Sequence, residues 1–233
     1  MAHADISETS QFNLNIKHQK WFRKDMGTEN VAPFLSSFVT LVRPNRILEI
    51  GAGYTTPFLI EGIEKTKSLL IDNNFNSNYK LNSYDPKMVL LEASDISQIY
   101  DNSVLAQIEN IKFLEFINQP FQGRSNYLKE RYGLFDFVWF DCGGYNEYSS
   151  FLDEYWDICS DYLFFHFTYT FGQPNELLKA ILQHAKKPYF RLDIIEPHKS
   201  TQGSLTILKK GSYFDSPQES VDYGINLLKK AIR

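Results

Sequence analysis

The feature that most constrains this fold is a strand, glycine turn and helix pattern in residues 46–61. The apolar residues Ile47, Leu48 and Ile50 predict a short buried strand, and Gly51 and Gly53 then end it. Thr56, followed by a proline that suits the first helical position, predicts a helix N-cap. Such a unit opens nucleotide-binding α/β domains, because the glycines let the backbone approach a ligand and the helix N-terminus favours an anionic group.

A carboxylate is expected at the end of the next strand. Residues 69–72 form an apolar run that predicts this second strand, ending in Asp72. A carboxylate at that position accepts hydrogen bonds from the ribose hydroxyls of an adenosine. A dinucleotide fingerprint would place a third glycine at position 56, where this chain has Thr56.

The pattern Glu49-x-Gly51-x-Gly53-x-x-Thr56 together with Asp72 resembles motifs I and II of the class I S-adenosylmethionine (SAM) dependent methyltransferases. One departure is Thr55, where a third glycine is common in that family. The resemblance implies an α/β fold with a Rossmann-like, seven-stranded, mostly parallel sheet of order 3-2-1-4-5-7-6 and helices on both faces. It implies SAM as the cofactor, with contacts from Glu49, Gly51, Ala52, Gly53, Thr55, Thr56, Asp72, Asn118 and Asp141.

The third strand has two candidates. Residues 111–117 fit best by their distance from the fourth strand, whereas residues 87–92 are a second apolar run of strand character. In the resembled family the adenine contact follows strand three. It is therefore Asn118 with Gln119 under the first assignment and Asp95 under the second.

The later elements are clearer. Residues 135–141 read as a buried parallel strand that ends in Asp141, and residues 162–168 read as strand five. Residues 189–196 and 204–208 predict an antiparallel closing pair. Helices are expected at residues 30–42, 147–159 and 175–186 and, from a capping box, at 216–233.

We expect three segments along the chain. Residues 1–29 are an N-terminal lid or extension, residues 30–212 the SAM-binding domain, and residues 213–233 a C-terminal helix. The terminal segments are the natural candidates for contacts in a homodimer.

Composition narrows the class of protein. The net charge of −4 does not suggest a non-specific polyanion-binding surface, which favours a small-molecule substrate over nucleic acid. No apolar run is long enough to span a bilayer and no signal-peptide pattern opens the chain, so we expect a cytoplasmic protein and no membrane partner. Two cysteines provide neither a disulfide framework nor a clustered metal site.

Asp141 and His166 are the candidate catalytic residues. Asp141 either contacts the methionine end of SAM, binds a divalent metal or caps the following helix. The segment Asp141-x-x-Gly144-x-x-x-Tyr148 resembles the Asp-x-x-Lys…Tyr segment of catechol-type, metal-dependent O-methyltransferases, but Gly144 replaces the lysine. The Asp-Asn pair of those enzymes falls on His166 and the phenylalanine after it, which argues against a Mg²⁺ site. We therefore expect no metal, with a softer metal on Asp141 and His166 as the alternative.

His166 has a near-neutral ordinary pKa that suits a general base for a hydroxyl, phenol or amine. The alternative is a partly buried histidine bonded to backbone. His198 reads as part of a solvated turn with Glu196.

The leading hypothesis is a SAM-dependent methyltransferase that acts on an oxygen or nitrogen of a small molecule. A SAM- or nucleotide-binding scaffold or partner subunit without methyl transfer is the alternative. An NAD-dependent oxidoreductase is a third option, against which Thr56 and the closing strand pair argue.

Overall fold

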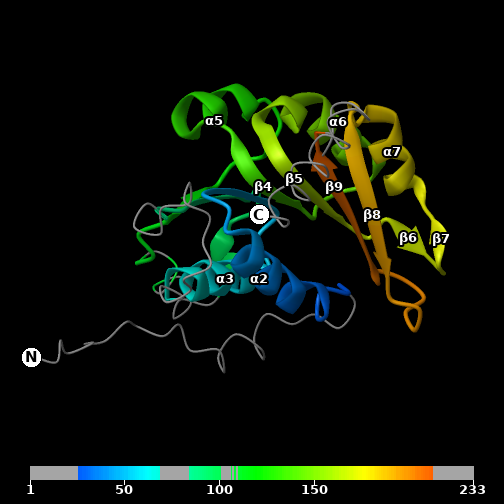
Figure 1. The fold of residues 1–233 in the computed structure, drawn as a ribbon, viewed down its shortest axis with the longest axis horizontal. Coiled ribbons are helices and arrows are strands. Elements are labelled where there is room, and N and C mark those ends of the chain that lie inside the picture. The colour runs from blue at the N-terminus through cyan, green and yellow to red at the C-terminus, as the bar shows by residue number, and fades with distance from the viewer. Residues whose placement is uncertain (1–25, 69–83, 101–105, 107, 109, 212–233) are drawn as a thin grey trace, which may run out of the picture.

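The computed structural model describes residues 26–68, 84–100, 106, 108 and 110–211. Its centre is a seven-stranded sheet of order β3-β2-β1-β4-β5-β9-β8 (Figure 1). Strands β3, β2, β1, β4 and β5 pair in parallel, and β9 is antiparallel to both β5 and β8. A short hairpin of β6 and β7 lies outside this sheet and shifts the numbering, so the predicted order 3-2-1-4-5-7-6 is confirmed. The strands are β1 (Arg46–Ile50), β2 (Lys87–Leu91), β3 (Leu114–Ile117), β4 (Phe135–Phe140), β5 (Cys159–His166), β6 (Tyr169–Thr170), β7 (Gln173–Pro174), β8 (Tyr189–Ile195) and β9 (Ser204–Lys210).

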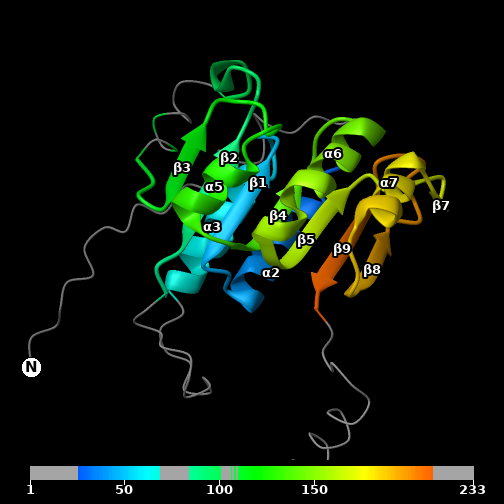
Figure 2. The same ribbon diagram turned by 90° about the horizontal axis from the view of Figure 1, so that it is seen from above.

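Helices cover both faces of the sheet, as the view from above shows (Figure 2). One face packs against α2 (Val31–Val42) and α3 (Thr56–Ser68), and the other against α5 (Ser125–Tyr132), α6 (Tyr145–Tyr155) and α7 (Glu176–His184). Short 3₁₀ helices η2 (Ile96–Gln98) and η3 (Trp156–Ile158) complete the described elements. The domain therefore has three layers, with one large apolar core on each face of the sheet.

The prediction of residues 69–72 as the second strand is wrong. Both edges of β1 are taken, by β2 on one side and β4 on the other. β2 is the later run, residues 87–91, whose last four residues are buried. The strand at residues 111–117 is confirmed in third place, although it begins at Leu114. Residues 69–72 themselves lie outside the described part of the chain.

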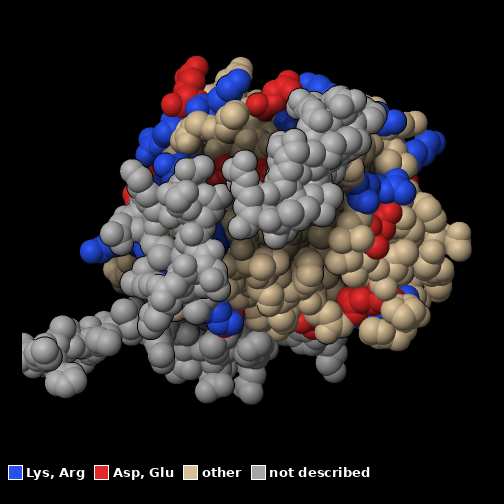
Figure 3. Space-filling view, viewed as in Figure 1, with Lys and Arg blue, Asp and Glu red and all other residues tan. Residues whose placement is uncertain are grey.

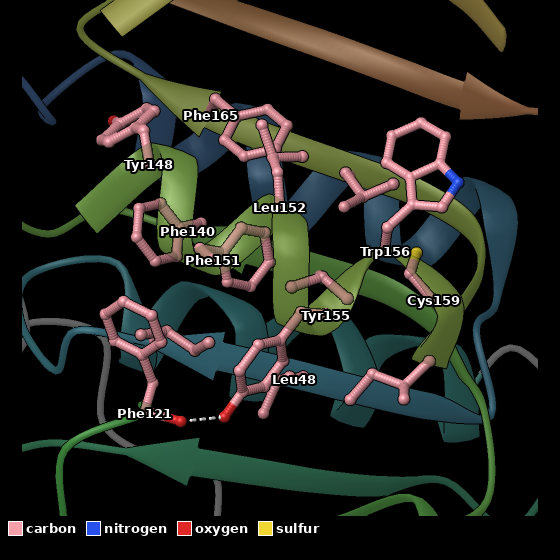
Figure 4. Packing of buried hydrophobic residues seen from close by; sticks show 14 of the residues in the cluster. Leu48, Phe121, Phe140, Tyr148, Phe151, Leu152, Tyr155, Trp156, Cys159 and Phe165 are labelled. Atoms are coloured by element: carbon pink, nitrogen blue, oxygen red, sulfur yellow. Dashed lines mark hydrogen bonds between the residues drawn. The ribbon is translucent and has the colours of Figure 1, made fainter. Parts of the chain in front are cut away.

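The high aromatic content is largely core. On the α6 face, Phe140 and Phe151 stack with ring centroids 4.2 Å apart, and Tyr148 meets Phe140 edge-on (Figure 4). The Tyr155 hydroxyl donates a hydrogen bond to the carbonyl oxygen of Phe121, so this buried phenol is satisfied.

The predicted helices are confirmed with changes in detail. Leu41 in α2 and Leu182 in α7 are 79% and 45% exposed, although both are apolar, because they lie off the helix faces that pack on the sheet. Asn175 caps α7 by accepting hydrogen bonds from two backbone amides. Residues 1–25 of the predicted N-terminal lid or extension and the predicted helix at residues 216–233 lie outside the described residues.

Charged side chains of both signs are interspersed on the face shown in Figure 3, without one large basic patch there. Among the described helices, none has the length and apolar character needed to cross a membrane.

Candidate cofactor and methyl-transfer site

Three parallel strands bring the predicted site together at their carboxyl ends. The Gly51 amide donates to the carbonyl oxygen of Leu91 at 3.0 Å, and the Asp141 amide donates to that of Ile50 at 3.2 Å. Gly51 has φ +96°, and a Cβ there would lie 2.7 Å from the Asp141 carbonyl oxygen. Glycine is therefore required at position 51 both for its conformation and for the close approach of two loops.

Gly53, unlike Gly51, has free space among the described residues where a side chain would lie. A Cβ added to Gly53 would meet no atom of the described residues within 4 Å. Space is therefore open on the Cβ side of Gly53, while its amide donates to Thr56 Oγ1 at 3.3 Å and its carbonyl oxygen accepts from the Tyr100 hydroxyl.

Glu49 is fully buried beneath this loop. Its Oε1 accepts a hydrogen bond from the Thr55 hydroxyl at 2.8 Å, whereas Oε2 has no hydrogen-bond partner among the described residues. Burial raises the pKa of Glu49 to about 8; the Thr55 and Thr56 hydroxyls oppose the rise, and the charges of Asp141 and Glu92 add to it. An orphaned buried carboxylate oxygen calls for a cationic or hydrogen-donating partner.

Glu92 occupies the position that the sequence reading gave to Asp72. It follows the last residue of β2, its Oε2 accepts the Ala52 amide at 2.8 Å and its Oε1 accepts the Ser94 amide at 2.7 Å. A carboxylate has about four lone-pair sites, so each oxygen can accept a further hydrogen bond. The signal was present in the sequence, because the apolar run before Glu92 reads as a strand.

Asn118 and Asp95, the two adenine candidates, have different environments. The Asn118 side-chain nitrogen donates to the carbonyl oxygens of Glu92 and Ser94 at 2.9 and 2.6 Å, which uses both of its N–H groups. Asp95 accepts the Ser97 amide at 3.0 Å as the cap of η2, and that hydrogen bond lowers the pKa of Asp95. The structure thus ties Asn118, but not Asp95, to the backbone around Glu92.

The Thr55 and Thr56 hydroxyls form hydrogen bonds with other protein side chains. Thr55 Oγ1 accepts the Trp139 indole N–H at 3.1 Å, and the Thr56 hydroxyl lies 2.9 Å from the hydroxyl of Tyr100. Both threonines are buried. Their hydroxyls therefore brace the loop from within the protein.

Asp141 and His166 contact each other. Asp141 Oδ1 lies 3.0 Å from His166 Nδ1, joining the ends of β4 and β5. The helix cap that was an alternative role for Asp141 is made by Glu147, whose Oε2 accepts the Gly144 amide at 2.8 Å. The Asp141 side chain remains 23% exposed, whereas that of His166 is 2% exposed.

Both ring nitrogens of His166 face acceptors. Nδ1 faces the Asp141 carboxylate, and Nε2 lies 3.1 Å from the backbone carbonyl oxygen of Gln202. Burial alone would lower the pKa of His166, but the charge and hydrogen bond of Asp141 and the carbonyl of Gln202 outweigh it and raise that pKa. The doubly protonated imidazolium satisfies both contacts at once, so neither nitrogen is free to accept a proton.

Other candidates contribute little to this site. Among the described residues, no group of three or more His, Cys, Asp or Glu side chains is placed to hold a metal ion. Burial, helped by the charge of Asp141, raises the pKa of Cys142 to about 12, which disfavours the thiolate. His198 is exposed and lies 3.3 Å from the Glu196 carboxylate, in the turn that the sequence suggested.

A scan against protein-family models finds no match for this chain, and a search of curated proteins finds none either. Solved structures do match. An O-methyltransferase from Bacillus cereus, solved in complex with SAH, superposes with a TM-score of 0.55 at 17% sequence identity, covering 78% of this chain and 81% of the other. The O-methyltransferase TomG from Streptomyces achromogenes, solved with SAM and involved in tomaymycin synthesis, gives 0.55 at 14% identity over 85% and 95% of the chains. An rRNA methylase from Streptococcus thermophilus gives 0.50 at 12% identity over 82% and 100%.

These similarities agree with the strand order and with the position of the glycine loop after β1. At such low sequence identity they establish the fold and leave the acceptor open. The chain has the Rossmann-like fold of the class I SAM-dependent methyltransferases.

Proposed function

We propose that this protein is a SAM-dependent methyltransferase that acts on an oxygen or nitrogen of a small molecule. The observation that carries the proposal is Glu49, a buried carboxylate with one orphaned oxygen beside the open glycine loop at Gly53. The charges of Glu92 and Asp141 both act on Glu49, so three carboxylates converge where a cationic ligand group would relieve their repulsion.

The residues present fit such a cofactor. Glu49 and Asp141 are suited to an ammonium group. The amides of Gly51, Ala52 and Gly53 already donate within the protein, to Leu91 O, Glu92 Oε2 and Thr56 Oγ1, and so hold the shape of the loop. Glu92 is suited to two ribose hydroxyls through its remaining lone pairs, and Asn118 to the amino group of adenine through its amide oxygen. When bound, SAM supplies an activated methyl group on a sulfonium.

The protein's part in the reaction is to bring the acceptor close and aligned. Asp141, at the end of β4, is the more exposed of the pair. The buried His166, at the end of β5, contacts its Oδ1 through Nδ1. We place Asp141 at the methyl-transfer end, with its oxygen Oδ2 turned to the ligands and His166 acting on the reaction through Asp141. This replaces the general base first suggested for His166, because both of its nitrogens are engaged.

The donor set does not fit a conventional Mg²⁺ site. Asp141 Oδ1 is bonded to a histidine whose own pKa is raised, and Mg²⁺ prefers several oxygen ligands. A small-molecule acceptor is supported by the net charge of −4 and by the interspersed charges in Figure 3. A cytoplasmic location is supported by Cys142 and Cys159, which are free thiols.

Isothermal titration calorimetry with SAM tests the cofactor assignment. We expect Glu92→Gln to weaken SAM binding about tenfold or more, because hydrogen bonds to a charged group are the strong ones. Asp95→Asn, a matched neighbouring carboxylate that caps η2, should leave the affinity near that of wild type. No SAM binding to the intact protein would remove the proposal.

Mass spectrometry of metabolite pools incubated with protein and SAM tests the reaction. A mass gain of one CH₂ unit on an acceptor, lost in Asp141→Asn, is expected. SAM binding without any methylated product would support the alternative of a SAM-binding scaffold.

A further inference from the structure

The His166 ring contacts a backbone carbonyl group 36 residues further along the chain. Its Nε2 faces the carbonyl oxygen of Gln202, in the loop between β8 and β9. Residues 27–30, just before α2, pack against that same loop. We call residues 27–30 together with residues 196–203 the N-terminal joint.

The packing in this joint is close. A Cβ added to Gly27 would lie 2.2 Å from the Gln202 carbonyl oxygen and 2.5 Å from the Gln202 Cβ. Gly27 has φ +66°, a conformation that favours glycine. The Gln202 carbonyl oxygen therefore both contacts His166 Nε2 and packs closely against Gly27.

Gln202 itself adopts a strained backbone, with φ +57° on a non-glycine residue. Such a conformation persists only where the surrounding structure imposes it. The β8–β9 loop is fixed on its other side because the Phe167 amide donates to Ser204 O at 3.0 Å, and that of Phe171 to Ser200 O at 2.7 Å. Contacts from two directions thus keep the Gln202 carbonyl aimed at His166.

Polar contacts also connect the two segments of the N-terminal joint. Lys199 Nζ lies 2.5 Å from a Glu29 carboxylate oxygen, 3.2 Å from Glu196 and 3.3 Å from the carbonyl oxygen of Gly27. The Asn30 amide donates to the Glu196 carboxylate. The segment before α2 is therefore bound to the loop by an ion pair and hydrogen bonds as well as by packing.

From these contacts we propose that the N-terminal joint is a positioning element for the site, which orients Asp141 through His166. A ring held at Nε2 can present Nδ1 in one direction only, and that direction meets Asp141 Oδ1 at 3.0 Å. This leaves Oδ2 of Asp141 for the ligands. Gly27 and Gln202 are then positioning residues for Asp141, with no contact to the reacting atoms. The proposed role of Asp141 in methyl transfer underlies the functional meaning of this joint, but the coupling itself is testable without SAM.

The charged groups that act on His166 come from several elements. Asp141 lies at the end of β4, Lys199 in the β8–β9 loop and Glu29 before α2, and the Tyr148 hydroxyl on α6 donates to the His166 backbone carbonyl at 2.6 Å. Variants that change Lys199 or Glu29 would alter the His166 titration directly by their charge. Neutral substitutions are needed instead.

The test is an NMR titration of the histidine rings in the full chain without SAM, with the His166 signal assigned by its loss in His166→Asn. Gly27→Ala should shift the His166 midpoint to lower pH, because displacement of the Gln202 carbonyl removes a partner of the charged form. Gly133→Ala is the matched control, because Gly133 has φ +80° but no atom of the described residues within 4 Å of its added Cβ. It should leave the midpoint unchanged.

An unchanged midpoint in folded Gly27→Ala, or an equal shift in Gly133→Ala, would overturn the coupling. If Gly27→Ala does not fold, Asn30→Ala decides the matter, because this neutral change removes the hydrogen bond to Glu196 and Asn30 makes no side-chain cap of α2. It should shift the midpoint in the same direction, and no shift would overturn the proposal.

A measurement of activity then tests whether the coupling between Gly27 and His166 matters for methyl transfer. Once methyl transfer is measured, the pH–rate profile of Gly27→Ala should move with the His166 midpoint while its Kd for SAM stays near that of wild type. A moved midpoint with an unmoved rate profile would overturn the positioning role while leaving the methyltransferase assignment intact.

Discussion

The phenol of Tyr100 lies 2.9 Å from the carbonyl oxygen of Gly53 and 2.9 Å from the hydroxyl of Thr56. Tyr100 is 1% exposed and comes from the connection between β2 and β3, whereas Gly53 lies in the loop after β1 and Thr56 is the first residue of α3. Burial, with the charge of Glu49, raises the pKa of Tyr100 well above its ordinary value, so the phenol keeps its proton. A neutral hydroxyl from another segment therefore fixes the shape of the glycine loop after β1.

Removal of this hydroxyl should weaken SAM binding more than it weakens the fold. In Tyr100→Phe the ring still fills its site, but the Gly53 carbonyl loses a partner and the loop gains freedom. We expect the Kd for SAM to rise between about threefold and tenfold, in line with a hydrogen bond of about 1 kcal/mol. Calorimetry at one pH measures the change.

Tyr127→Phe is the control, because Tyr127 is an exposed tyrosine of α5 on the opposite side of the sheet from the α3 helix. Its affinity for SAM should equal that of wild type. An equal loss of affinity in the two variants, or none in Tyr100→Phe, would contradict the bracing role.

Much of the sheet was predictable because buried parallel strands carry continuous apolar runs. Residues 137–140 of β4 and 162–165 of β5 are such runs, and in β1 the apolar residues are interrupted only by Glu49. The second strand was misassigned because residues 69–72 and 87–91 both satisfy the same local pattern. Only pairing with β1, a contact across about 40 residues of chain, distinguishes them.

The placement of Gly51 after β1 and of Asp141 after β4 was predictable, because each follows an apolar strand. Their roles toward a ligand stay predictions. Local patterns do not encode the contact between Gly27 and Gln202, which joins residues 175 positions apart and depends on packing of the closed fold. The sequence could name His166 as a candidate, but not that both of its nitrogens are bonded.

SAM binding should release a proton from Glu49. Glu49 has a pKa of about 8 without a ligand, so it is largely protonated at pH 7. A cationic group beside its orphaned oxygen would favour the carboxylate, and binding would then expel that proton. Calorimetry at pH 7 in two buffers of different ionisation enthalpy should give different apparent binding enthalpies. Glu49→Gln should reduce this buffer dependence, and identical buffer dependence in the variant would contradict the assignment.

Gly62 should be sensitive to substitution although it lies within a helix. A Cβ at Gly62 would meet the Ser36 carbonyl oxygen at 2.7 Å and the Val39 Cβ at 2.8 Å, where α3 packs on α2. Gly62→Ala gains about 1 kcal/mol in helix propensity but forces the helices apart, at a cost of about 1–3 kcal/mol. We expect no net gain and a loss of up to about 2 kcal/mol in the free energy of unfolding, measured with urea. The Kd for SAM should not change, and a clear gain in stability would show that the helices have room.

The buried charge of Glu49 should also make the ligand-free protein less stable as pH rises. Its pKa is about 8 in the folded chain and 4.5 ordinarily, so between these values the folded state holds a proton that the unfolded state has lost. The free energy of unfolding then falls with rising pH, by up to about 1.4 kcal/mol per unit and by roughly 5 kcal/mol across the window. His166 acts in the same direction, because its raised pKa gives stability at low pH that is lost as pH rises through the folded value.

Comparison with Glu49→Gln isolates the first effect, because His166 contributes to both proteins. We expect the variant to be more stable than wild type at pH 9 and the difference to shrink steadily toward pH 5, in urea unfolding at a series of pH values. Added SAM should narrow the difference at high pH, because it stabilises the charged Glu49 in wild type. Parallel stability curves for the two proteins would mean that Glu49 finds a partner in the folded chain that already satisfies its second oxygen.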